Sequence, residues 1–274
     1  MKIMIAGLGL IGGSMAKALR RAGIAADGTD REEVCARALA EGAVGGVARD
    51  LSAYDVVLIA LPPAAAMRML DEGGFADGAI VADICGIKDE IEKLVFSKPR
   101  NYRYVGCHPM AGKEVSGFEN SCETLFDGAS MIVIENEKTD KAARETLEAL
   151  FLKMGFGCIR RCDARYHDRK IAYTSQLAHI VSNAYVKSET ANGFPGFTGG
   201  SFQDMTRIAG VDESVWTDLY FLNRDAVTEE LSGLIARLEE YLAALKNGDR
   251  EGLRALLRAG RLRKAELDAE RKIE

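Results

Sequence analysis

The feature that most constrains this chain is a glycine-rich motif near its start, Gly7-Leu8-Gly9-Leu10-Ile11-Gly12. It follows the apolar run Ile3 to Ala6, which is typical of a buried strand, and the residues behind it (13–22) predict a helix. The first glycine permits a tight turn, the second lets the backbone approach a pyrophosphate, and the third lets the helix pack closely on the strand. Free N–H groups at the start of that helix would receive the phosphates. We therefore expect a bound dinucleotide, contacted by Gly7, Gly9, Leu10, Ile11 and Gly12.

The choice of dinucleotide depends on an acidic residue about 20 positions further on. Asp30 closes the next apolar stretch, Ile24 to Thr29, and there it would accept hydrogen bonds from both ribose hydroxyls. This favours NAD as the cofactor. Arg31 keeps NADP open as an alternative, since an arginine near this position can accommodate a 2′-phosphate. A glycine-rich turn without any ligand is the other alternative.

Composition and charge limit the classes of partner. The 274 residues are 47% apolar and 28% charged, which is typical of a globular protein of about two domains. Lysine and arginine number 36 against 41 aspartates and glutamates, so the net charge is −5. No general basic field exists to hold nucleic acid or an anionic membrane, and we expect neither as a partner.

The cysteines predict neither a metal site nor a disulfide framework. The six are scattered, without a C-x-x-C pair or a cluster with histidine at metal-ligand spacing: Cys35, Cys85, Cys107, Cys122, Cys158 and Cys162. The chain begins directly with a strand, without the pattern of a secretory signal, and no run approaches 18 apolar residues. We expect a cytoplasmic protein with reduced thiols and no bound metal.

Apolar runs and helical patterns alternate through the first half of the chain, which predicts an α/β fold with a parallel sheet. After the first βαβ unit, helices are expected over Arg31–Glu41 and Thr139–Met154, and strands over Val56–Leu61, Ala79–Ile84, Tyr104–Cys107, Met131–Glu135 and Gly157–Arg161. Strand patterns stop at Asp163. We predict a Rossmann-type dinucleotide-binding domain over residues 1–163 and an all-α domain over residues 164–274.

The all-α half is expected to start with one long helix. Its predicted helices are Tyr166–Glu189, Phe202–Ile208 after a glycine-rich break at Asn192–Gly200, and two or three more from Asp212 to the end.

Ligands of open α/β sheets bind beyond the carboxyl ends of the strands, so chemistry is expected just after strands. Besides the glycine motif, two segments qualify: residues 83–88 (Asp-Ile-Cys-Gly-Ile-Lys) and residues 107–114, which contain His108. Oxidation of an alcohol needs a group that takes the hydroxyl proton as hydride leaves. A neutral imidazole suits that task, and His108, in a loop of small residues, is the best base in the chain.

Four further polar residues of the all-α half are candidates. His179 lies one helical turn after Gln176, and His167 is on about the same side of the expected long helix. A helical histidine among apolar residues is more often structural than functional. Arg207 is expected either to form a buried ion pair, for example with Asp204, or to bind a substrate carboxylate.

Taken together, these segments resemble the prephenate dehydrogenase family, including its arogenate-using relatives, over nearly the whole chain. Residues 108–112 (His-Pro-Met-Ala-Gly), extended by Ser116-Gly117, look like the His-Pro-[Met/Ile]-Ala-Gly box of the family. His167-Asp168 followed by residues 175–179 resembles its helix with three spaced histidines, and residues 204–209 resemble its substrate-arginine segment. Residues 216–224 are also similar.

The resemblance implies oxidative decarboxylation of prephenate to 4-hydroxyphenylpyruvate, in tyrosine biosynthesis. Hydride would pass to NAD⁺ from the ring carbon that bears the hydroxyl, and CO₂ would leave from the opposite ring carbon. His108 would accept the hydroxyl hydrogen bond, and Arg207 would bind a substrate carboxylate. His179 and Gln176 would hold the rest of the substrate, and the helical domain would form a homodimer.

Two positions depart from the family pattern. Many members have a serine that binds the substrate hydroxyl where this chain has Gly86, so water, a backbone N–H or the Cys85 thiol would have to replace it. Gln176 stands in place of the middle histidine of the helix, which leaves the choice between prephenate and arogenate open.

More distant alternatives also remain open. A 3-hydroxyacid-type dehydrogenase would use Lys170 as its catalytic lysine but leaves residues 108–112 unexplained. An NAD-sensing module without turnover is the other alternative.

Overall fold

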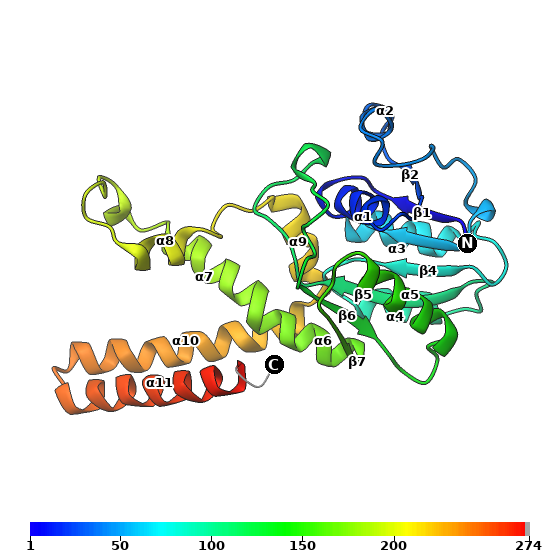
Figure 1. Cartoon of the computed structure of the whole chain (residues 1–274). Coiled ribbons are helices and arrows are strands. Elements are labelled where there is room, and N and C mark those ends of the chain that lie inside the picture. Colours follow the sequence, from blue (N-terminus) through cyan, green and yellow to red (C-terminus); the bar gives the residue numbers. More distant parts are fainter. Residues whose placement is uncertain (272–274) are drawn as a thin grey trace. The chain divides into compact units, whose positions relative to one another are not determined.

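A mostly parallel sheet forms the centre of the first part of the molecule (Figure 1). The computed structural model describes residues 1–271, and in that range the sheet has seven strands in the order β2-β1-β3-β4-β5-β6-β7. The strands are β1 (Ile3–Ala6), β2 (Asp27–Thr29), β3 (Val56–Ile59), β4 (Ile80–Asp83), β5 (Arg103–Pro109), β6 (Ser130–Ile134) and β7 (Cys158–Cys162). Neighbouring strands from β2 to β5 are parallel, β6 is antiparallel to β5, and β7 is parallel to β6. The α/β prediction is confirmed.

Helices cover both faces of this sheet. They are α1 (Leu10–Arg21), α2 (Glu32–Ala40), α3 (Pro63–Glu72), α4 (Asp89–Phe96) and α5 (Lys141–Lys153), with short turns η1 (Leu51–Ala53) and η2 (Phe118–Asn120). Successive strand residues point to opposite faces. Ile3 and Ile5 therefore join the core that contains residues of α1, α2 and α5, whereas Met4 and Ala6 join the core with residues of α3 and α4.

The helical part begins, as expected, with one long helix, which runs without a break from Ala164 to Tyr185 instead of Tyr166–Glu189 and contains a π-helical segment. The elements of the helical part are α6 (Ala164–Ile171), the π-helical segment η3 (Ala172–Gln176), α7 (Leu177–Tyr185), η4 (Glu189–Ala191), α8 (Gly200–Thr206), α9 (Glu213–Leu222), α10 (Arg224–Lys246) and α11 (Arg250–Arg271). A π turn contains more residues than an α turn, so side chains before and after η3 are out of phase with a regular α-helix. The side chain of Gln176, inside η3, is bonded to α9 and the residue after it, and such tertiary bonds are invisible to periodicity.

The chain folds into two compact units, Met1–Arg224 and a second unit that begins at Asp225. The residues from Ala164 to Arg224 thus pack with the sheet. The boundary after residue 163, between a dinucleotide-binding domain and a helical domain, remains a prediction.

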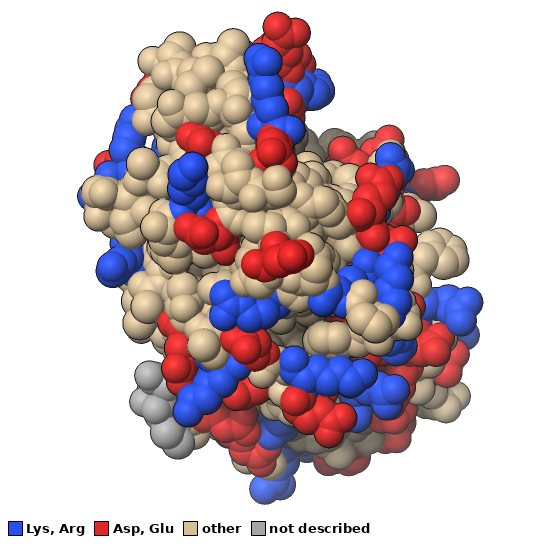
Figure 2. Space-filling model, turned by 90° about the vertical axis from the view of Figure 1, so that its right-hand side faces the viewer, with Lys and Arg blue, Asp and Glu red and all other residues tan. Residues whose placement is uncertain are grey.

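The second unit consists of α10 and α11. A stripe of four apolar side chains on α10 is exposed: Ile235, Leu238, Leu242 and Leu245. Their spacing of three or four residues puts them on one face of the helix. No helix within residues 1–271 has the length and apolar character needed to cross a membrane. On the face drawn in Figure 2, basic and acidic side chains are interspersed.

Candidate active site

The glycine motif forms a tight connection between β1 and α1. Gly7 has φ +88°, a left-handed conformation that favours glycine, and a Cβ on Gly12 would lie 1.8 Å from the Gly7 carbonyl oxygen. A Cβ on Gly9 would meet nothing within 4 Å, and Gly9 begins α1 without a side-chain cap. Two of the glycines are thus required by the fold of the loop, whereas Gly9 leaves open space in front of the helix N-terminus. This arrangement fits the pyrophosphate of a dinucleotide.

Asp30 lies directly after β2 and is tied to the same loop. Its Oδ2 accepts the Leu8 N–H at 2.6 Å and its Oδ1 accepts the Arg31 N–H at 2.7 Å. Each carboxylate oxygen has a second lone pair, so the group retains capacity for ribose hydroxyls. The Arg31 guanidinium is close to two carboxylates, 3.9 Å from Asp30 and 3.3 Å from Glu33.

His108 lies in β5, near its end, and not in a loop as the sequence suggested. β1, β3, β4 and β5 are parallel neighbours, so Gly7, Gly86 and His108 all lie at the carboxyl edge of the sheet. The loop that follows β5 packs on α1, where the Cys122 N–H donates to Ser14 Oγ at 3.0 Å. The predicted base and the predicted cofactor loop thus belong to one edge of one sheet.

A chain of hydrogen bonds connects His108 to two residues of α6. His108 Nδ1 lies 2.9 Å from His167 Nε2, and His167 Nδ1 lies 2.6 Å from Asp168 Oδ1. His167 and Asp168 are buried, and His108 is partly exposed. Burial above all, helped by His167 and the Lys88 ammonium, lowers the pKa of His108 well below its usual value. At neutral pH the His108 ring is therefore uncharged and able to accept a proton.

Behind this chain lies a fully buried ion pair, Lys88 with Asp83. Asp83 ends β4 and also accepts the Tyr104 hydroxyl at 2.6 Å, and burial raises the pKa of Tyr104 well above its usual value. Chemistry was expected in the segment 83–88, but neither Asp83 nor Lys88 was assigned a role of its own. The signal in the sequence is their spacing, since an acid that closes an apolar strand is followed five residues later by a lysine.

Gly86 lies next to Nε2 of His108, the predicted base. A Cβ on Gly86 would lie 3.6 Å from His108 Nε2 and 3.8 Å from Leu219 Cδ2. The Cys85 thiol points elsewhere, 3.6 Å from the Leu61 carbonyl oxygen, and burial raises its pKa. Cys85 therefore does not replace the missing serine hydroxyl, and next to His108 the loop leaves room for a Cβ atom at ordinary van der Waals distance.

Gln176 is buried, and both the nitrogen and the oxygen of its side-chain amide form hydrogen bonds within the protein. Its Nε2 donates to the Leu219 carbonyl at 3.0 Å, and its Oε1 accepts from Asn223 Nδ2 at 2.7 Å. Asn223 also donates to the Asp168 carbonyl at 2.8 Å. These bonds tie the end of α9 to the helix that carries His167. A substrate contact for Gln176 remains a prediction, whereas its structural role is visible.

His179 is half-buried and stacks on Trp216, with 4.0 Å between ring centroids. Its Nδ1 lies 2.9 Å from the Ser175 carbonyl oxygen, which can only accept, so Nδ1 carries the proton. In the neutral ring, Nε2 is then an acceptor. His179 is not bonded directly to the chain formed by His108, His167 and Asp168.

Arg207 follows α8, is largely exposed and pairs with Glu114, not with Asp204 as one interpretation of the sequence had it. Glu114 belongs to the loop six residues after His108. The contact therefore connects the substrate-arginine segment to the loop that follows the predicted base. A guanidinium that is accessible and held by a single carboxylate can exchange that partner for a substrate carboxylate.

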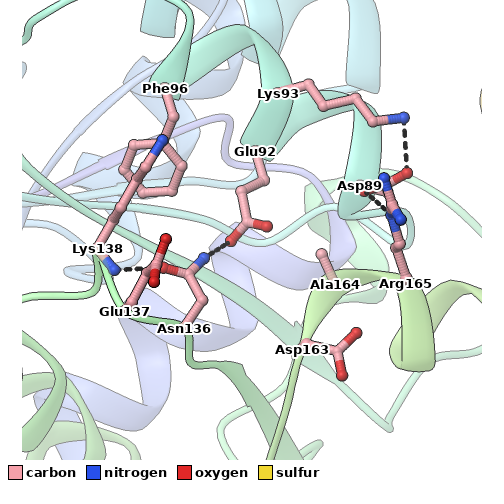
Figure 3. A pocket seen from close by; sticks show the side chains of 10 residues that line it. All are labelled: Asp89, Glu92, Lys93, Phe96, Asn136, Glu137, Lys138, Asp163, Ala164 and Arg165. Atoms are coloured by element: carbon pink, nitrogen blue, oxygen red, sulfur yellow. Dashed lines mark hydrogen bonds and ion pairs between the residues drawn. The ribbon is translucent and has the colours of Figure 1, made fainter.

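A surface pocket of about 500 Å³ lies elsewhere, and Figure 3 shows the ten residues that line it. Its charged groups are largely paired: Lys93 and Arg165 with Asp89, and Asn136 with Glu92. None of the predicted site residues lines it. Within the described residues no cluster of three or more histidine, cysteine or acidic side chains is arranged to hold a metal ion.

Comparisons with known proteins agree with this geometry. Residues 15–159 match the family model described as prephenate dehydrogenase, nucleotide-binding domain, and residues 163–259 match the one described as prephenate dehydrogenase, dimerization domain. Prephenate dehydrogenase of Bacillus subtilis is 30% identical over 271 residues, which are 92% of this chain and 72% of that protein.

Two solved structures are similar along nearly the whole chain. The structure of prephenate dehydrogenase from A. aeolicus in complex with hydroxyphenyl propionate and NAD⁺ has a TM-score of 0.84 and 25% identity, covering 97% of this chain and 98% of that one. Synechocystis arogenate dehydrogenase has a TM-score of 0.79 and 25% identity, covering 97% of this chain and all (100%) of that one. The family models together span both halves of the sequence, and this chain belongs to the prephenate dehydrogenase family.

Proposed function

We propose that this protein oxidises and decarboxylates prephenate to 4-hydroxyphenylpyruvate, with His108 as the base. The observation that carries the proposal is the free Nε2 of a neutral His108 at the carboxyl edge of the sheet, beside Gly86 and on the edge that holds the glycine motif. The cofactor is NAD, which, when bound, accepts the hydride.

The residues of this chain then have separate tasks. His108 Nε2 accepts the proton of the substrate hydroxyl as the carbon–hydrogen electron pair leaves the ring. Loss of CO₂ returns the electron pair of the breaking carbon–carbon bond to the ring, which becomes aromatic as a phenolate. His108 then gives the proton back to the phenolate oxygen, so the reaction releases no net proton. Arg207 binds a substrate carboxylate in exchange for Glu114.

Arogenate is the second candidate substrate, and the hydrogen bond between His179 Nδ1 and the Ser175 carbonyl favours it. Because His179 Nδ1 donates to the Ser175 carbonyl, the neutral His179 ring offers only an acceptor at Nε2. The ammonium group of arogenate is a donor that matches this acceptor, whereas the keto oxygen of prephenate requires a protonated His179.

The test is reduction of NAD⁺ by the purified protein, followed by absorbance with prephenate and arogenate in parallel and with NADP⁺ as cofactor control. We expect turnover with prephenate and appearance of 4-hydroxyphenylpyruvate. Faster turnover with arogenate would change the substrate but keep the mechanism. Binding of NADH without reduction of NAD⁺ by either substrate would refute the proposal and favour a sensing module.

We further propose that the protein is a homodimer whose contact includes the apolar stripe of α10, Ile235, Leu238, Leu242 and Leu245. The match of residues 163–259 to a dimerization domain supports this assignment. Light scattering after size exclusion is expected to give the dimer mass, and Leu238→Lys the monomer mass. Glu240→Lys, on the opposite face of the helix, is the control; a dimer that survives Leu238→Lys would refute the assignment.

We also infer that the enzyme works in the cytoplasm, where its six free cysteines stay reduced. Fractionation of the native host checks this location, and recovery of the protein outside the cytoplasm would overturn it.

A further inference from the structure

We propose that His167 and Asp168 are positioning residues that hold His108 in the one tautomer able to accept a proton from the substrate. The proposal rests on the dehydrogenase function above, and it assigns a task to two residues whose role could not be predicted from the sequence.

The chain of bonds begins at the N-terminus of α4. The Lys88 N–H donates to both oxygens of the Asp168 carboxylate, at 2.9 and 3.2 Å, and the Asp89 N–H donates to Oδ2 at 2.9 Å. Asp168 is buried, so these backbone groups fix its position. An ionised carboxylate only accepts hydrogen bonds. Of the two partners at 2.6 Å, His167 must therefore be the donor, through Nδ1–H.

The next bond follows from this one. A neutral His167 with its proton on Nδ1 has an unprotonated Nε2, which can only accept. His108 Nδ1, 2.9 Å away, must then carry the proton of the His108 ring. The lone pair of His108 is consequently on Nε2, the nitrogen that faces Gly86. The opposite tautomer would bring two lone pairs face to face between the rings.

The surrounding charges keep this arrangement in place. Lys88, from the loop before α4, and Asp83, from β4, form the buried ion pair behind the rings, and Asp168 is the carboxylate on α6. Burial lowers the pKa of His167. Asp168 and Asp83 act to raise it, and the Lys88 ammonium acts to lower it further, with burial the largest effect. His167 thus remains neutral and remains an acceptor. When His108 takes the substrate proton, the hydrogen bond from its Nδ1 to His167 strengthens and spreads the positive charge towards Asp168.

The decisive variant is Asp168→Asn. Its amide oxygen can still accept from the backbone of α4 while its NH₂ group donates to His167 Nδ1. His167 would then carry its proton on Nε2, and His108 would be forced into the tautomer with Nε2–H. We expect kcat to fall about 10²-fold or more with unchanged affinity for NADH, because the base is present but its lone pair points away from the substrate.

The tautomer itself is measured by ¹⁵N NMR of the histidine rings. The chain has only three histidines, so single substitutions assign every signal. The wild type is expected to show His108 protonated at Nδ1, and Asp168→Asn to show it protonated at Nε2. This measurement needs no substrate. It therefore distinguishes an error in the proposed tautomer of His108 from an error in the proposed reaction.

Three further variants keep the test decisive. His167→Gln provides an amide oxygen that can accept from His108 without the link to Asp168, and it is expected to lose less activity than His167→Ala. Asp163→Ala removes only the cap of α6, whose Oδ1 accepts the Tyr166 N–H, and should lower the melting temperature without changing the tautomer.

Either of two results overturns the inference. One is a wild-type His108 protonated at Nε2. The other is a folded Asp168→Asn variant that keeps kcat within twofold. If Asp168→Asn does not fold, the wild-type spectrum and the comparison of His167→Gln with His167→Ala decide.

Discussion

Gly86→Ser should restore a hydrogen bond to the substrate hydroxyl and increase the rate of this enzyme. A Cβ at position 86 would lie 3.6 Å from His108 Nε2, 3.7 Å from its Cε1 and 3.8 Å from Leu219 Cδ2. These are ordinary van der Waals distances, so the added atom needs no rearrangement. Gly86 also does not have a positive φ, so a side chain causes no backbone strain. The serine hydroxyl would lie next to the nitrogen that receives the substrate proton.

The size of the effect follows from the single bond that is gained. One neutral hydrogen bond contributes about 0.5–1.5 kcal/mol net, which corresponds to roughly a 2- to 12-fold change in a rate or binding constant. If the bond is equally strong in the ground state and the transition state, it lowers KM; if it strengthens as the proton leaves, it raises kcat. In both cases we expect kcat/KM for prephenate to rise by about fivefold.

The assay is NAD⁺ reduction under steady-state conditions, with Gly86→Ala as the matched control. Alanine adds the same Cβ without the hydroxyl, so the ratio between the two variants isolates the hydrogen bond. Melting temperatures report any change in packing. Equal kcat/KM for the serine and alanine variants, with intact folds, would show that the space beside His108 Nε2 is not where the substrate hydroxyl binds.

Four other predictions test the same site. His108→Asn should preserve NADH binding and lower kcat by about 10²-fold or more, and near-normal turnover would remove His108 from the mechanism. Arg207→Lys should mainly raise KM, because a point charge replaces a bidentate fork; an unchanged KM with a lower melting temperature would make Arg207 structural. The pKa of His108 is lowered in the folded protein, so the acid limb of the kcat/KM profile should lie below pH 6.5, and a limb above that value would contradict the lowered pKa. The unfolded chain then binds the proton more readily than the folded one, so the free energy of unfolding should fall as pH drops below about 6.5, as denaturant titrations can measure.

Much of the dinucleotide half could be predicted from the sequence because its signals are local. Runs such as Val56–Ile59 are apolar without alternation, as strands covered on both faces must be, and the glycine motif requires a strand before it and a helix after it. His108 could be singled out because it comes at the end of such a run. Each of these inferences needs only neighbouring residues.

The rest depends on contacts between distant segments, which periodicity does not contain. The π segment Ala172–Gln176 inside the expected helix was not predicted, and the partner of Arg207 is Glu114, 93 residues away in the chain. Lys88 is the clearest case. A lysine is nearly always exposed, and only the fold shows that this one is fully buried against Asp83.

The buried charges around His108 suggest why so many polar groups are concentrated in one place. Before the reaction the network contains one formal positive charge, on Lys88, and two formal negative charges, on Asp83 and Asp168, which leaves −1. When His108 takes the substrate proton, the sum becomes zero. Burial and the Lys88 ammonium both oppose that protonation in the resting enzyme, as the lowered pKa of His108 shows. The base is therefore neutral while it waits for the substrate. The Asp168 carboxylate, connected to it through His167, is the group that favours the protonated ring, so removing that carboxylate should cost more in the transition state than in substrate binding.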